Sequence, residues 1–160
     1  MGKARIVCAM SGGVDSSVAA ALLVEQGYEV VGVFLRLGGA AAAGTTAGTG
    51  RHQGCCSAAD SLDARRVADL LGIPFYAVDA SGTFRRIVDD FVDAYAAGET
   101  PNPCVRCNGW LKFGALLDLA RSLDANRVAT GHYARARHER GRARLFRGLH
   151  AAKDQSYVLF

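Results

Sequence analysis

SGGVDS, residues 11–16, lies between the apolar run 6–10 and a helical pattern that begins at Ser16 and ends near Gly27. Two glycines let the backbone turn sharply after a strand and approach an anion, and the serines bring hydroxyls to the unpaired amides of a helix N-terminus. No lysine follows the glycines and no G-x-G-x-x-G occurs, so the segment is neither a Walker loop nor a dinucleotide fingerprint. We interpret it as a phosphate-binding loop with Asp15 as a magnesium partner. The alternative is a glycine turn with a helix cap.

Short apolar runs alternate with amphipathic segments along the chain, a pattern typical of a parallel sheet with helices on both faces. The predicted strands are residues 5–10, 29–35, 75–79 and 127–130. The predicted helices are residues 16–27, 57–71, 83–97 and 108–123. A hairpin is expected over residues 133–148, with its turn near Arg140-Gly141. The apolar stripe of the third helix is assigned to the core: Phe84, Ile87, Val88, Phe91, Val92 and Tyr95.

Residues 38–54 differ from the rest of the chain, because they consist mainly of Gly, Ala and Thr without apolar periodicity. A loop of this length in a compact domain is usually functional or disordered. Its position after the second predicted strand places it at the ligand-binding edge of a parallel sheet. We expect it to close over a substrate.

Length and composition predict one domain with its own core, because the chain has 160 residues, half of them apolar. No apolar stretch approaches the ~20 residues that cross a bilayer, and residues 1–5 lead into a strand without a signal peptide. We therefore expect a cytoplasmic protein with no membrane partner. In that reducing setting the five cysteines are interpreted as reactive, metal-binding or buried thiols. Cys8, inside a predicted strand, is expected in the core.

Basic residues outnumber acidic ones by 19 to 15, and the excess is concentrated between residues 127 and 147. Glu139 is the only acid of that segment. The pattern fits either a solvated hairpin or a nucleic-acid contact. The segment holds seven arginines: Arg127, Arg135, Arg137, Arg140, Arg142, Arg144 and Arg147.

TPNPCVRCN, residues 100–108, is the second motif. Its two prolines hold a loop extended, and Cys107 is expected at the start of a helix beside Arg106, a setting that favours a thiolate nucleophile. Cys104 and Cys107 could also form half of a zinc site, but the other cysteine pair, residues 55–56, is vicinal. An iron-sulfur cluster held by Cys104, Cys107 and a third cysteine outside this chain remains an alternative.

The order of these motifs, together with GCCS (54–57), KF (112–113), TGHYAR (130–135) and KDQSY (153–157), resembles that of the tRNA-specific 2-thiouridylase family. The resemblance covers residues 5–160. It implies an adenine nucleotide alpha hydrolase-like fold, which is a PP-loop ATP pyrophosphatase domain of the α/β class with a β-hairpin near its C-terminus. It also implies a sulfurtransferase that uses ATP and magnesium to adenylate the wobble uridine of tRNA and then replaces the 2-carbonyl oxygen by sulfur.

The resemblance implies roles for individual residues by position. Cys107 matches the nucleophilic cysteine, whereas many family members carry aspartate at the position of Cys104. Asn102, Pro103 and Cys104 match the contacts to the target base. The tRNA contacts correspond to His132, Lys153, Asp154 and Gln155. The nucleotide contacts correspond to Ala9, Met10, Ser11, Gly12, Gly13, Val14, Asp15, Ser16, Leu35 and Gly131.

In this family a second cysteine, which carries persulfide sulfur, and a C-terminal β-barrel lie downstream of the position of Phe160. Residues 1–160 are thus expected to form the catalytic domain and to bind ATP without thiolating tRNA alone. Sulfur would come from a persulfide donor protein, through either a persulfide pair that ends as a disulfide or an iron-sulfur cluster. The rival interpretations are a small-molecule adenylating synthetase, which does not need the 100–108 motif, and a non-catalytic ATP- or tRNA-binding module.

Overall fold

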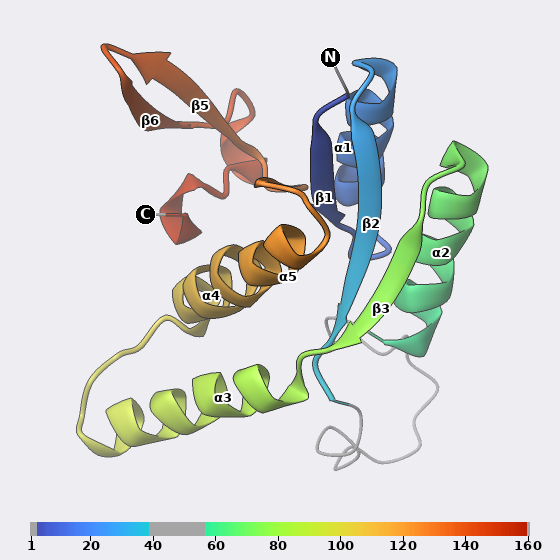
Figure 1. Ribbon diagram of the computed structural model, residues 1–160. Helices are drawn as coiled ribbons and strands as arrows, with labels where there is room; N and C mark the ends of the chain where they lie inside the picture. Colours follow the sequence, from blue (N-terminus) through green and yellow to red (C-terminus); the bar gives the residue numbers. More distant parts are fainter. Residues whose placement is uncertain (1–2, 39–56, 160) are drawn as a thin grey trace.

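The computed structural model describes residues 3–38 and 57–159, so most of the 38–54 segment and the 55–56 cysteine pair lie outside the described residues. A four-stranded parallel sheet occupies its centre, in the order β3-β2-β1-β4 (Figure 1). Because β1 pairs with β2 on one side and β4 on the other, the order reverses at β1. The predicted parallel sheet is confirmed. The strands are β1 (Arg5–Ala9), β2 (Glu29–Arg36), β3 (Phe75–Asp79) and β4 (Arg127–Thr130).

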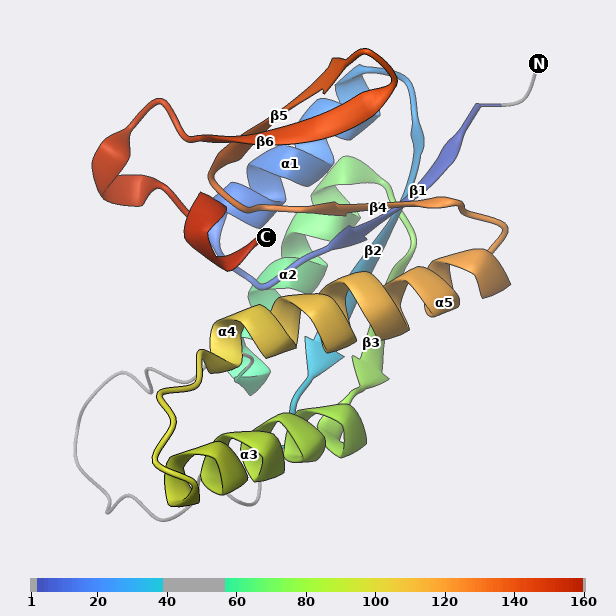
Figure 2. The same cartoon turned by 90° about the vertical axis from the view of Figure 1, so that its left-hand side faces the viewer.

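Helices cover both faces of this sheet, as predicted (Figures 1 and 2). α1 (Val14–Glu25) and α2 (Ala58–Leu71) pack on one face, and α5 (Leu116–Ser122) packs on the other. Alternate residues of a strand point to opposite faces, so Cys8 faces α1 and α2 while Val7 faces α5. None of the helices in the described ranges combines the length and apolar character that a membrane crossing requires.

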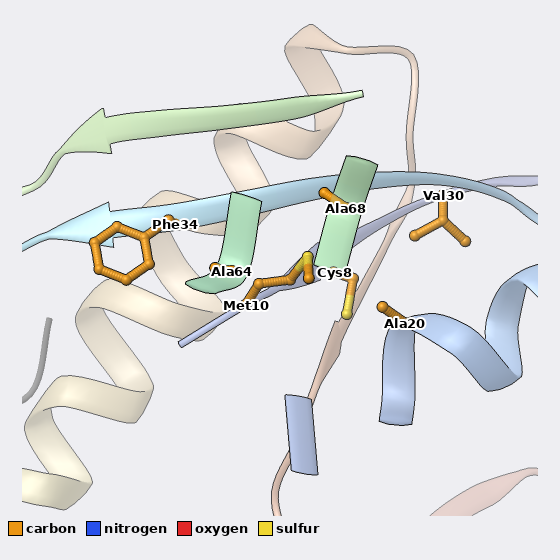
Figure 3. Close-up of a cluster of buried hydrophobic side chains, with 7 residues drawn as sticks. All are labelled: Cys8, Met10, Ala20, Val30, Phe34, Ala64 and Ala68. Carbon is orange, nitrogen blue, oxygen red and sulfur yellow. The ribbon is translucent and has the colours of Figure 1, made fainter. Parts of the chain in front are cut away.

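The core beneath α1 and α2 is built from small helix residues against larger sheet residues (Figure 3). Alanines on the two helices are fully buried, which lets the helix backbones approach the sheet closely. Cys8 is also fully buried, as predicted, and burial raises the pKa of its thiol to about 11. The cluster consists of Cys8, Met10, Ala20, Val30, Phe34, Ala64 and Ala68.

The first two helices differ in how their N-termini are capped. α1 begins at Val14, two residues before the predicted start, and its N-cap Gly13 makes no side-chain capping bond. α2 has the expected capping box, in which the Ser57 hydroxyl accepts from the Asp60 amide and the Asp60 carboxylate accepts from the Ser57 amide. α1 therefore keeps N-terminal amides that no side chain caps.

The helix predicted over residues 108–123 begins five residues earlier, at Pro103, and changes its winding twice. It consists of α4 (Pro103–Arg106), the π-helix η1 (Cys107–Ala115) and α5. The Asn102 side chain accepts from the Cys104 amide and starts the helix. Within η1 a side chain at Gly114 would come within 3.1 Å of the Gly109 carbonyl oxygen, so two glycines five residues apart suit the wide π turn.

The apolar stripe assigned to the core on the third helix is mostly not buried, and that prediction was wrong. In α3 (Ser81–Ala96) only Ile87 is buried, whereas Val88, Val92 and Tyr95 are 43–59% exposed. α3 follows the edge strand β3 and runs out past the sheet (Figure 1). Its second half therefore has no sheet surface to pack against.

The predicted hairpin is confirmed, with β5 (Ala134–Glu139) paired to β6 (Arg142–Arg147). Arg140 and Gly141 form the turn, both with positive φ (50° and 77°), as a two-residue hairpin turn requires. The hairpin stands apart from the parallel sheet (Figure 1). Two short 3-10 helices follow it, η2 (Ala151–Lys153) and η3 (Ser156–Val158).

We predict that Leu116→Ala lowers the free energy of unfolding by about 2–5 kcal/mol, because Leu116 is 1% exposed and its truncation leaves a cavity between α5 and the sheet. Leu70→Ala is the matched control, since Leu70 is 86% exposed and its loss should cost less than about 0.5 kcal/mol. Urea unfolding followed by circular dichroism measures both. Equal losses in the two variants would contradict the assignment of Leu116 to the core.

Candidate functional site

A pocket of about 320 Å³ lies at the carboxyl end of β1 and β4, where the strand order reverses. Ligands of parallel α/β sheets bind at such a switch point, so we prefer this pocket to two larger hollows beside Lys3 and at the hairpin turn. Its walls come from the loop after β1, the start of α1, the loop after β4, β2 and η1. The lining residues are Ala9, Met10, Ser11, Gly13, Val14, Asp15, Ser16, Val33, Leu35, Lys112, Thr130, Gly131, His132 and Gln155.

Hydrogen bonds from serine hydroxyls to backbone groups hold the loop after β1. The buried Ser16 hydroxyl donates to the Gly13 carbonyl at 3.1 Å and accepts from the Ser11 amide at 3.1 Å. Ser17 donates to the same carbonyl at 2.9 Å. These bonds curl the loop over the first turn of α1, and the N-terminal amides of α1 border the pocket. Such amides attract anions, and phosphate above all.

Two glycines permit backbone contacts that a side chain would prevent. Gly12 has a φ of +80°, and a Cβ there would lie 2.8 Å from Asp60 Cα in α2. A Cβ at Gly131 would lie 2.6 Å from Ser16 Cα and would also meet the Ser16 amide nitrogen. The loop after β4 therefore lies directly against the first turn of α1. Gly12 faces α2 and is not part of the pocket lining.

His132 lies between Lys112 and Thr130. The Lys112 ammonium donates to His132 Nε2 at 3.2 Å, because an ammonium has no acceptor. We therefore assign the ring proton to Nδ1, which donates to Thr130 Oγ1 at 2.8 Å. The Phe113 ring covers one side, with its centroid 6.3 Å from that of His132. Burial, and secondarily the Lys112 charge, lower the pKa of His132 to about 4.

The KDQSY motif fastens the end of the chain to the hairpin and to η1. Gln155 accepts from the Tyr133 amide at 2.8 Å through its side chain and donates to the Tyr133 carbonyl through its own amide. Asp154 accepts from the Gly148 amide at 2.7 Å, and this bond lowers its pKa. Asp154 thus has an internal role, whereas Lys153 is exposed.

Asn108 makes the connection to η1. It is buried and donates from Nδ2 to the Val158 carbonyl at 2.8 Å. Its Oδ1 has no hydrogen-bond partner among the described residues. Asn108 therefore ties the C-terminal segment to the π-helix at the residue that follows Cys107.

The position predicted for Cys107 at the start of a helix is wrong. Its amide already bonds to carbonyls of the preceding turn, at Pro103 and Cys104, so Cys107 lies one turn inside a continuous helix. The exposed Cys104 lies in the first turn instead. Cys107 is half-buried against the cluster formed by Ala80, Ile87 and Leu111.

Arg106, the residue before Cys107, has its own partners on a neighbouring helix and on η1. Its guanidinium bonds to Asp90 of α3 at 3.1 Å and lies 5.2 Å from the centre of the Trp110 ring. The helix start, one of the two reasons for a reactive Cys107, is therefore not supported by this geometry. The assignment of Cys107 as the nucleophile therefore depends chiefly on its match to the family motif.

The structure brings most of the predicted nucleotide contacts together, along with His132 and Gln155. Asn102, Pro103, Cys104, Cys107, Lys153 and Asp154 do not line the pocket. Sequence reasoning missed Val33, Lys112 and Thr130 as pocket residues. Lys112 and Thr130 stand inside quoted motifs, so the signal was present. Whether these two side chains face the pocket, however, depends on the winding of the π-helix and on the rotation of the His132 ring, which the sequence does not show.

Metal ligands are sparse in the described ranges. There, no group of three or more His, Cys, Asp or Glu side chains is close enough to hold an ion. Asp15 is exposed and is the only carboxylate in the pocket lining. Magnesium fits this arrangement, because it commonly uses one carboxylate together with substrate phosphates and water. Cys104 and Cys107 alone do not fit an iron-sulfur cluster, which needs further ligands.

Comparison with known proteins identifies related sequences. Residues 4–160 match the family model described as the tRNA methyl transferase HUP domain. The chain is 55% identical to the tRNA-specific 2-thiouridylase MnmA of Rhodopirellula baltica, over 98% of this chain and 45% of that protein. It is 58% identical to the protein of the same name from Mycobacteroides abscessus, over 97% of this chain and 42% of that protein. The resemblance found in the sequence is confirmed, and the chain spans less than half the length of these relatives.

Among solved structures, a predicted subunit of tRNA methyltransferase from Methanocaldococcus jannaschii aligns with a TM-score of 0.45 and 20% identity. The alignment covers 86% of this chain and 55% of that one.

We predict that Gly131→Ala disrupts the pocket, because the added methyl group would displace the first turn of α1. The expected loss in the free energy of unfolding is about 1–3 kcal/mol, as for other overpacked sites. Gly82→Ala is the control, since nothing lies within 4 Å of a Cβ at Gly82 and alanine favours a helix. Urea unfolding tests both variants. A Gly131→Ala protein as stable as the wild type would show that α1 and the β4 loop are not in contact.

A second prediction concerns the titration of His132. The pKa of His132 in the folded protein is about 4, below the ordinary value of 6.5. Between pH 6.5 and pH 4 the unfolded chain therefore binds a proton at this residue that the folded chain does not. This group therefore lowers the free energy of unfolding as the pH falls from 6.5 to 4, and contributes no pH dependence above that range. His132→Asn should make stability depend less on pH there. NMR titration of the imidazole signals, assigned with this variant, would contradict the geometry if His132 titrated near 6.5.

Proposed function

The chain belongs to the tRNA methyl transferase HUP domain family, and we propose that it is the ATP-activating domain of a tRNA 2-thiouridylase. One observation carries the proposal: the SGGVDS loop and Gly131 enclose a pocket on whose border stands Lys112, which shares one continuous helix with the Cys104-x-x-Cys107 motif. The names of the relatives support thiolation of tRNA as the reaction.

The pocket suits a nucleoside triphosphate. The α1 amides and the loop after β1 offer donors for pyrophosphate oxygens, and the contact between Gly131 and Ser16 keeps the two loops together. Leu35 and Met10 supply an apolar wall for an adenosine group. Magnesium, held by Asp15 together with the phosphates, would neutralise charge on the departing pyrophosphate.

The reaction then takes two displacements. The 2-carbonyl oxygen of the uridine attacks the α-phosphorus of ATP, and pyrophosphate leaves. A sulfur nucleophile next attacks C2, and AMP leaves with the original oxygen. The residues proposed to meet the target base are Asn102, Pro103 and Cys104, with Cys107 as the nucleophilic thiol. Sulfur is proposed to come from a persulfide donor protein and to reach the base with the help of a second cysteine outside residues 1–160.

One face of the hairpin is suited to the phosphates of tRNA. The pairing places Arg137 directly opposite Arg144, and Arg135 and Arg142 project from the same face. Glu139 lies on the same face and bonds to Arg144 at 3.3 Å, but four arginines against one acid leave this face with a net positive charge, which a polyanion would neutralise. Lys153 and His132 are the further proposed tRNA contacts. A tRNA substrate also favours a cytoplasmic location.

Two other reactions make different predictions. A small-molecule synthetase would keep the phosphate loop but would need neither the arginine face nor the 100–108 motif. Methyl transfer, which the family description names, would need a methyl donor and would not use ATP cleavage for activation. Both are outcomes of the following experiment.

We expect the purified chain to catalyse exchange of labelled pyrophosphate into ATP only when unmodified tRNA and magnesium are present, because uridine is the group that is activated. With a persulfide donor the chain alone should make no 2-thiouridine, as measured by mass spectrometry of nucleosides. Joined to the C-terminal part of the Rhodopirellula baltica relative, it should make 2-thiouridine. Cys107→Ser should then abolish the product and leave the exchange intact.

Cys104→Ser is the matched control in the fusion, and continued formation of 2-thiouridine would make Cys104 a neighbour of the reaction. Exchange without tRNA would favour a small-molecule synthetase. Methylated uridine, or abundant 2-thiouridine from Cys107→Ser, would overturn the proposed mechanism.

A further inference from the structure

Lys112 is a half-buried cation that the mechanism above does not use. Five ion pairs occur among the described residues, and Lys112 takes part in none of them. Its hydrogen-bond partner is the neutral imidazole of His132. A positive charge that is partly removed from water without an anionic partner is unfavourable. An anion bound in the pocket would remove this cost.

The π-helix decides where Lys112 points. In an α-helix a residue five positions after Cys107 would lie about 140° around the axis from it. η1 spans Cys107–Ala115, and in a π-helix the backbone bonds join residues five apart, which brings Lys112 round toward the side of Cys107. Lys112 reaches the pocket border, while Cys107 packs against the adjoining cluster. Leu35 contacts both the pocket and that cluster.

His132 and Thr130 hold the ammonium in place. The ring accepts a hydrogen bond from Lys112 at Nε2 and donates one from Nδ1 to Thr130 at 2.8 Å, so the ring orientation is fixed from both sides. An ammonium has three donors. Among the described residues only one is used, and two remain for ligand oxygens.

We propose that the Lys112 ammonium, positioned by His132, binds the α-phosphate of ATP and remains on that phosphate through to AMP. This inference depends on the proposed function. The loop after β1 and the α1 amides meet the pocket from one side of the sheet, and Lys112 comes from the helix on the other side (Figure 2). The uridine attacks the α-phosphate. We assign this phosphate to Lys112 because the motif proposed to meet the base and supply the thiol lies on the same helix. The β- and γ-phosphates then belong to the loop.

This arrangement separates the two products by binding site. When the uridine oxygen bonds to the α-phosphorus, the bond to the β-phosphate oxygen breaks and its electron pair leaves with pyrophosphate. Negative charge on the non-bridging α-oxygens faces Lys112 in the transition state. AMP therefore needs Lys112, whereas pyrophosphate needs the loop and Asp15.

Calorimetry with AMP and with magnesium pyrophosphate as separate probes tests the proposal on the purified chain. Lys112→Met should weaken AMP binding about 10- to 100-fold, as expected for loss of a charged hydrogen bond, and should change pyrophosphate binding less than about twofold. Asp15→Ala should do the reverse. Lys3→Met, the same change just before β1 and at the far end of that strand from the pocket, should alter neither affinity. If Lys112→Met does not fold, Lys112→Gln, which keeps a donor toward His132, takes its place.

The outcomes separate the two levels of inference. A wild-type chain that binds neither AMP nor ATP would overturn the proposed function. AMP binding that survives in Lys112→Met would overturn only the role of Lys112. Equal losses for AMP and pyrophosphate would also overturn it, because the charge would then act on the whole pocket and not on the α-phosphate.

Discussion

The close contact between Gly131 and the first turn of α1 is the constraint on which the site depends. β4 pairs with β1, and the loops that leave the two strands come so close that no side chain fits at Gly131. The contact fixes the uncapped start of α1 beside the loop that carries His132. A pocket with amide donors on one wall and side chains on the other follows from it. Serine bonds to Gly13 then give the loop after β1 its shape.

The π-helix has a comparable importance for the other wall. One continuous helical segment runs from Pro103 to Ser122, directly after the capping Asn102. It carries Cys104, Cys107 and Lys112, and its last part packs an apolar face on the sheet. Regular α-helical winding would turn Lys112 away from the side of Cys107. π-helical segments often occur at functional sites. Here the change of winding lets one element contribute both to the core and to the pocket.

Tertiary structure also changed the interpretation of the cysteines. In the sequence, Cys107 stands beside an arginine and before a helical pattern, which favours a thiolate. In the fold, that arginine is engaged by Asp90 and Trp110, and the helix starts before Cys104. α3, which supplies Asp90, is also where the core prediction failed. Its stripe has helical periodicity, but periodicity does not say whether a partner surface exists.

The sequence by itself determined the parallel sheet, its four strands, the hairpin turn and the capping box of α2. These features depend on local preferences and on short apolar patterns, which neighbouring residues carry. Only the tertiary structure decided that Lys112 and Thr130 meet at His132, that Asn108 holds Val158, and that Arg106 pairs with Asp90. Such contacts join residues far apart in the chain or depend on helix winding and ring rotation. A linear pattern does not encode those directions, because they are set by how the packed elements face one another.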